Sequence, residues 1–153
     1  MKITDFLDIR SVMTELQGDD KNAVLKEMAA NLSAQLASVN PEQVLSVLLE
    51  REKLGSTAIG EGVAIPHGKL PGISQVHGLF ARSSGGVDFD SIDGGPTHLF
   101  FLLVAPENSA GDHLKALARI SRLLKDSEFR SRLMKATSRE EIFGTIQEED
   151  EKF

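Results

Sequence analysis

The chain has 153 residues, of which 41% are hydrophobic and 26% charged, and its formal net charge is −6. These proportions are typical of one globular domain, and the acidic balance argues against nucleic acid or anionic membranes as main partners. The chain contains no cysteine, which excludes disulfides, zinc–thiolate sites and thiol nucleophiles.

The beginning of the chain lacks the apolar core of a secretory signal. No segment of the sequence approaches the roughly 20 apolar residues that a membrane-spanning helix needs. We therefore expect a cytoplasmic protein with no stable insertion into a membrane.

The first third of the chain predicts two helices after an extended segment. Residues 10–16 are expected to be extended, and residues 18–20 supply a turn and an N-cap. Apolar side chains then recur at helical spacing over residues 21–36. The sequence Asn-Pro-Glu-Gln at 40–43 begins a second helix, which we expect to end at Gly55.

The middle of the chain predicts a sheet. Residues 63–65, 76–82 and 97–105 have the composition of strands. The last of these is nearly all apolar, which suits a central strand that is covered on both faces. Glycine pairs at 85–86 and in 93–96 are expected to form turns between strands.

Three further helices are expected near residues 112–124, 127–135 and 139–147. The charged tail from about residue 148 is expected to fray. Two helices, a sheet region and three helices together predict the α/β class: a single domain over residues 1–153, with a mixed parallel/antiparallel sheet flanked by helices.

A glycine-rich loop over residues 55–70 is the least ordinary part of the sequence. It contains a lysine and so invites comparison with a nucleotide-binding P-loop. The match fails because Gly62 and Gly68 are separated by five residues rather than four. Leu70 also stands where a serine or threonine would bind magnesium. The sequence therefore predicts no nucleotide cofactor.

His67 lies in this loop between Pro66 and Gly68. The proline stiffens the chain, and the glycine is expected to let another molecule approach closely. Imidazole is largely neutral near pH 7, so one ring nitrogen has a lone pair that can attack phosphorus and form a covalent intermediate. On this triplet alone, a turn histidine that caps a strand remains an alternative.

Other residues are candidates to complete such a site. Arg51 near a helix end can bind phosphate oxygens, Glu61 can orient an imidazole or pair with the arginine, and His113 at a helix start can bond a phosphoryl oxygen. Each is also explained as an ordinary surface or capping residue. His77 and His98 fall within predicted strands, and we interpret them as structural.

Residues 49–57 and 65–69 together resemble the active-site region of phosphotransferase-system enzyme IIA domains of the fructose/mannitol class, the type-2 EIIA domains. The resemblance is greatest to the nitrogen-regulatory branch of this family. It extends over nearly the whole chain and includes residues 88–94, the apolar strand ending at Ala105 and the helix of His113. It implies the type-2 EIIA fold.

The resemblance also implies roles for the candidate residues. His67 would receive a phosphoryl group on Nε2 from a histidine-phosphorylated HPr-like carrier, without a bound metal. His113 would be the second active-site histidine, Arg51 a contact to phosphate or partner, and Glu61 a nearby acid. A glutamate at position 61 resembles the sugar-transporting branch. The apolar surface around the site is expected to draw on four residues: Leu54, Ile59, Val63 and Leu70.

The leading hypothesis is a regulatory phosphocarrier whose phosphorylation state alters its binding to target proteins. Potassium transport or its sensor kinase, and nitrogen-linked transcription, are processes attached to this family. A second hypothesis is a stand-alone sugar-specific IIA that donates phosphate to a IIB protein. Two hypotheses from other classes are a metal-dependent hydrolase using His67, His113 and Glu61, and a binding module without chemistry.

Overall fold

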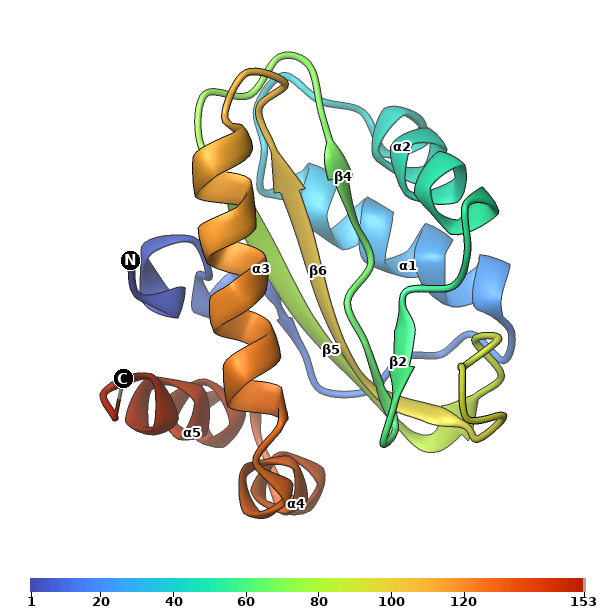
Figure 1. Cartoon of the computed structure of the whole chain (residues 1–153), viewed down its shortest axis with the longest axis vertical. Helices are drawn as coiled ribbons and strands as arrows, with labels where there is room; N and C mark the ends of the chain where they lie inside the picture. Colours follow the sequence, from blue (N-terminus) through green and yellow to red (C-terminus); the bar gives the residue numbers. More distant parts are fainter. Residues whose placement is uncertain (153) are drawn as a thin grey trace.

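A six-stranded sheet forms the middle of the computed structural model, which describes residues 1–152 (Figure 1). Its strands are β1 (Val12–Met13), β2 (Ala58–Gly60), β3 (Val63–Ala64), β4 (His67–Lys69), β5 (His77–Val87) and β6 (Thr97–Ala105). The order across the sheet is β1-β5-β6-β3-β2, and β4 also pairs with β6. β5 is antiparallel to β6, whereas β3 and β4 run parallel to it. The predicted mixed sheet is confirmed.

β6 is the buried centre of the sheet, as its apolar sequence predicts. Successive side chains of a strand point to opposite faces, so β6 contributes to two cores. Leu99, Phe101 and Leu103 pack in one core, and the alternate residues Phe100 and Leu102 pack in the other. This double burial explains why the strand has no polar face.

Helices cover both faces of the sheet in one α/β domain (Figure 1). The helices are α1 (Lys21–Ala34), α2 (Pro41–Lys53), α3 (Ala110–Leu124), α4 (Ser127–Lys135) and α5 (Arg139–Asp150), with short 3-10 turns η1 (Ile3–Asp5) and η2 (Ile9–Ser11) near the N-terminus. α1 and α2 pack on one face, and the last three helices pack on the other. In residues 1–152 every helix is too short or too polar to span a bilayer.

The predicted helix starts are confirmed by their caps. Asp20, Asn40 and Ser138 each accept a hydrogen bond from a backbone N–H in the first turn of the helix that follows. The glycine pair at 85–86, in contrast, does not end a strand. β5 continues to Val87 with a bulge after Arg82, which the positive φ of Gly86 (81°) allows.

The expected fraying of the charged tail from residue 148 is wrong. α5 continues to Asp150, which is 1% exposed. Its carboxylate accepts hydrogen bonds from the backbone N–H of Ile3 and from Nε of Arg119, both at 2.7 Å. An ionic and a backbone partner together offset the cost of burying this charge, so the end of α5 is held against Ile3 and against α3.

Candidate functional site

His67 is the first residue of β4, where its register partner on β6 is Leu103. The following residue, Gly68, lies directly against Val47 of α2, and a Cβ at this glycine would overlap the valine. Val47 and Arg51 are four residues apart and share one face of α2, so the close contact brings Arg51 to the imidazole. The expectation that Gly68 makes room for another molecule is therefore wrong, because the space is taken by α2.

Two hydrogen bonds assign the proton on the His67 ring. Nδ1 lies 2.8 Å from the backbone oxygen of Ile65, which is only an acceptor, so Nδ1 carries the hydrogen and donates it. Nε2 keeps its lone pair and accepts from Nε of Arg51 at 3.3 Å. Nη1 of Arg51 donates to the backbone oxygen of Gly55 at 2.9 Å. The site thus presents a nucleophilic nitrogen beside a fixed positive charge.

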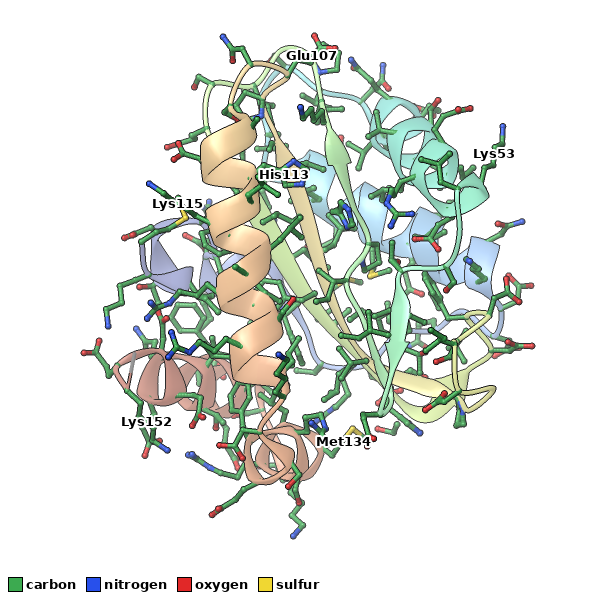
Figure 2. The ribbon with its side chains drawn as sticks, viewed as in Figure 1. Lys53, Glu107, His113, Lys115, Met134 and Lys152 are labelled. Carbon is green, nitrogen blue, oxygen red and sulfur yellow. The ribbon has the colours of Figure 1, made fainter. Side chains whose placement is uncertain are left out.

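His113 stands opposite His67, in the first turn of α3. The two ring centroids are 5.6 Å apart, with the rings inclined at 73°. Figure 2 shows His113 on the side of α3 that faces the sheet, where it is only 8% exposed. Its Nε2 has no hydrogen-bond partner among residues 1–152. This nitrogen is therefore unused by the described residues, and the start of α3 has backbone N–H groups of the kind that bind anions.

Burial keeps both imidazoles neutral near pH 7. Burial is the largest influence on the pKa of His67 and lowers it. The hydrogen bond to Ile65 raises this pKa, the charge of Arg51 lowers it, and the charge of Glu52 raises it. The pKa of His113 is also lowered, first by burial and then by the nearby His67 and Lys69. Neutral rings retain the lone pair that a nucleophile needs.

Glu61 does not lie at this site. It occupies the two-residue turn between β2 and β3, and its carboxylate is 3.6 Å from Arg130 of α4. Val63 pairs with Leu99 of β6, four residues before the partner of His67, which is roughly 13 Å along the sheet. Glu61 lies beyond Val63, so it neither orients the imidazole of His67 nor pairs with the arginine of α2.

A metal site built from His67, His113 and Glu61 finds no support in this geometry. The hairpin holds Glu61 at the other end of the sheet from the two histidines. Within residues 1–152, moreover, no three histidine, aspartate or glutamate side chains are grouped so that they could hold a metal ion.

The two remaining histidines are placed as the structural interpretation expects. Nδ1 of His98 lies 3.0 Å from the backbone oxygen of Ser83. His77 pairs with Val104, whose side chain belongs to the core beneath α1 and α2. Directly paired residues share a face of the sheet, so His77 points away from His67, whose partner belongs to the other core.

The four apolar residues expected around the site fall into three groups. Val63 and Leu70 are fully buried core residues, and Ile59 lies beside Glu61 at the distant hairpin. Leu54, at the end of α2, is 84% exposed. Leu114, next to His113, is 67% exposed and was missed by the sequence interpretation, since an apolar residue in a helix start carries no signal of exposure.

Glu52 is the charged residue of this region that the sequence interpretation missed. Its side chain is 5% exposed and accepts hydrogen bonds from Thr57 in the loop after α2. The only available signal was its position next to Arg51, which on a solvated helix end has no special meaning. The contacts that bury it come from α1 and from the loop, and helical periodicity does not report them.

Known proteins similar to this chain were found by sequence and by structure. The family model described as "Phosphoenolpyruvate-dependent sugar phosphotransferase system, EIIA 2" matches residues 5–149. A nitrogen regulatory protein of Bradyrhizobium diazoefficiens is 47% identical over 146 residues, which are 95% of each chain. The fructose-specific EIIABC component of the phosphotransferase system of Bacillus subtilis is 38% identical over 151 residues, 98% of this chain and 24% of that protein. The crystal structure of nitrogen regulatory protein IIA-Ntr from Neisseria meningitidis superimposes with a TM-score of 0.88 at 35% identity, covering 94% of this chain and 98% of that one.

The backbone of Glu61 leads to a prediction about stability. Its φ of 58° lies in the left-handed region, which asparagine tolerates better than glutamate. The ion pair that would be lost joins a glutamate that is 79% exposed, and such pairs contribute little. We expect Glu61→Asn to raise the free energy of unfolding by about 0.5 kcal/mol in urea denaturation. Glu61→Ala removes the same ion pair without relieving the backbone, so equal stability of the two variants would contradict this explanation.

The lowered pKa values of His67 and His113 predict a pH dependence of stability. Just below the ordinary imidazole pKa of about 6.5, the folded chain binds fewer protons than the unfolded chain. Stability is therefore complete above this value and is lost as the pH falls through it toward the folded pKa values. We expect the free energy of unfolding to decrease between about pH 7 and about pH 5.5 in urea denaturation. His113→Gln should flatten the dependence, and an unchanged slope would show that His113 does not contribute.

Proposed function

The chain belongs to the EIIA 2 family of the phosphoenolpyruvate-dependent sugar phosphotransferase system, and from this membership we propose that it carries a phosphoryl group on His67. The observation that carries the proposal is the ring of His67. Its Nδ1–H donates to Ile65, so Nε2 carries the lone pair, which accepts a hydrogen bond from the guanidinium of Arg51 in the resting site.

In the proposed step, Nε2 of His67 attacks the phosphorus of a phosphohistidine on an HPr-like carrier. The new N–P bond forms as the N–P bond of the carrier breaks, and the carrier imidazole leaves with the bonding pair. Nδ1 of His67 keeps its proton and its bond to Ile65 throughout. Neither a nucleotide nor a metal is needed, because positioning and charge stabilisation supply most of the catalysis in phosphoryl transfer.

Arg51 and His113 stabilise the transferred group in this proposal. Nε of Arg51 occupies the lone pair of Nε2 in the resting site, so phosphorylation displaces it, and the guanidinium can then bind the phosphoryl oxygens. His113 carries its proton on Nε2 in this proposal and donates it to another phosphoryl oxygen; the support is that this nitrogen has no partner among residues 1–152. Leu54 and Leu114 supply an exposed apolar rim for the partner protein.

We propose that the phosphorylation state of His67 regulates other proteins. The support is the identity of 47% to a nitrogen regulatory protein over 95% of both chains. Potassium transport or its sensor kinase is the class of target that this function implies. The sugar-specific alternative has support of its own, since the chain is 38% identical to a segment of a fructose-specific EIIABC component.

The proposal is tested by mass spectrometry. After incubation with enzyme I, phosphoenolpyruvate and a nitrogen-type HPr-like carrier, we expect a gain of about 80 Da that acid removes. His67→Ala should show no gain, because its side chain has no nucleophile. His98→Ala is a matched control, since it removes a histidine that lies outside the site. A label retained in His67→Ala would refute the assignment.

Onward transfer distinguishes the regulatory from the sugar-specific function. Phosphorylated chain, labelled with ³²P and freed of carrier, is mixed with purified IIB proteins of the fructose and mannitol systems. The regulatory hypothesis predicts that the label remains on His67 over the time in which a sugar-specific IIA of known activity transfers it. Efficient transfer to a IIB protein would establish the sugar-specific function in its place.

A further inference from the structure

Glu52 is a buried carboxylate that receives three donors from two other segments. Its side chain is 5% exposed, at the end of α2. Lys21, at the start of α1, places Nζ 2.9 Å from Oε1. The backbone N–H of Thr57 donates to Oε1 at 3.1 Å, and the hydroxyl of Thr57 donates to Oε2. Such a set of charge-assisted bonds fixes the loop after α2 rather than merely solvating a charge.

One series of hydrogen bonds leads from this carboxylate to the ring of His67. The backbone oxygen of Thr57 accepts from the N–H of Ile65 at 3.1 Å. The backbone oxygen of Ile65 in turn accepts from Nδ1 of His67 at 2.8 Å. Thr57 therefore joins Glu52 to the residue that holds the ring and its Nδ1–H tautomer.

A second series leads from the same loop to the guanidinium. Two residues before Thr57, the backbone oxygen of Gly55 accepts from Nη1 of Arg51 at 2.9 Å. Nε of Arg51 reaches Nε2 of His67. The loop held by Glu52 thus orients both the nucleophile and the cation beside it.

We propose that Glu52 is a positioning residue for phosphoryl transfer at His67, acting through Thr57 on the imidazole and through the Gly55 backbone on Arg51. The inference rests on the proposed function of His67. Glu52 does not touch the reacting nitrogen in this scheme. Its part is to hold the nucleophile and the cation in one geometry before the carrier arrives.

Lys21 makes this arrangement possible by compensating the buried charge. Its Nζ also lies 3.4 Å from Asp90 and 4.7 Å from the ring centroid of Phe89. The hydroxyl of Ser56 donates to the backbone oxygen of Phe89 at 2.6 Å, which ties the same loop to the segment after β5. A buried carboxylate without a partner would be strongly destabilising, so Glu52 can hold the loop only because Lys21 of α1 balances its charge.

The matched pair Glu52→Gln and Glu50→Gln tests the proposal. Glutamine keeps an acceptor for the N–H of Thr57 but loses the charge and the pair with Lys21. Glu50 is on the same helix, 71% exposed and paired only with Lys53 among the described contacts, so its variant removes an equal charge without touching the loop. Each variant is loaded by the phosphorylated HPr-like carrier, and its His67 tautomer is read from long-range ¹H–¹⁵N spectra.

We expect Glu52→Gln to load roughly 10- to 100-fold more slowly than wild type, because small displacements of reacting groups cost rates of this order. The maximal loading rate, measured at saturating carrier, should fall. The carrier concentration that gives half of the maximal rate should stay the same. The Nδ1–H tautomer of His67 should be less populated, and the pKa of His67 should fall further, because the charge of Glu52 raises it. Glu50→Gln should match wild type in all of these. Wild-type loading and tautomer in Glu52→Gln would overturn the inference.

Thr57→Val and Thr57→Ser keep the test decisive if Glu52→Gln does not fold. Serine retains the hydroxyl that donates to Glu52, whereas valine removes it and keeps the volume. Thr57→Val should slow loading and shift the tautomer, and Thr57→Ser should restore both. Identical behaviour of the two variants would overturn the inference. The tautomer measurement needs no phosphoryl donor. A wild-type chain that takes up no phosphoryl group would therefore refute the function of His67 separately from the positioning by Glu52.

Discussion

The contact between Gly68 and Val47 is the constraint on which the site depends. A side chain at Gly68 would force α2 away from β4, and Arg51, one helical turn beyond Val47, would move with it. The separation of 3.3 Å between the guanidinium and Nε2 of His67 therefore follows from a packing distance between a helix and a strand. Close packing of α2 on β4 therefore sets the geometry of the reacting groups, because Arg51 belongs to the helix and His67 to the strand.

The position of β4 explains why two histidines from distant segments meet. β4 pairs with β6, and α2 and α3 reach it from the two faces of the sheet (Figure 1). The side chain of His67 lies on the same face of the sheet as its partner Leu103, the face covered by α3, and there it contacts His113 in the first turn of that helix. Burial lowers the pKa of each ring, so the arrangement that brings the histidines together also keeps them neutral.

Charge is distributed around this site by burial and partner. Arg51 is bonded to the ring and to the loop, whereas Glu52, its neighbour in sequence, turns to Thr57 and to Lys21. Two adjacent residues of one helix therefore bond to different residues of the loop, Arg51 to Gly55 and Glu52 to Thr57. Glu61, which resembles a site residue in sequence, instead closes a hairpin and pairs with α4. Glu52 and Glu61 differ because the backbone holds one at the end of α2 and the other in the hairpin between β2 and β3.

The sequence by itself determined the α/β class, the helix starts capped by Asp20 and Asn40, and the central strand buried on both faces. Each of these depends on local periodicity or on a capping side chain, which a short window contains. It also singled out His67, Arg51 and His113, which the structure brings together. Only the tertiary structure decided the distant place of Glu61, the buried partners of Glu52 and the anchored end of α5. These depend on which strand pairs with which and on what a helix packs against, and such long-range contacts leave no periodic trace in the chain.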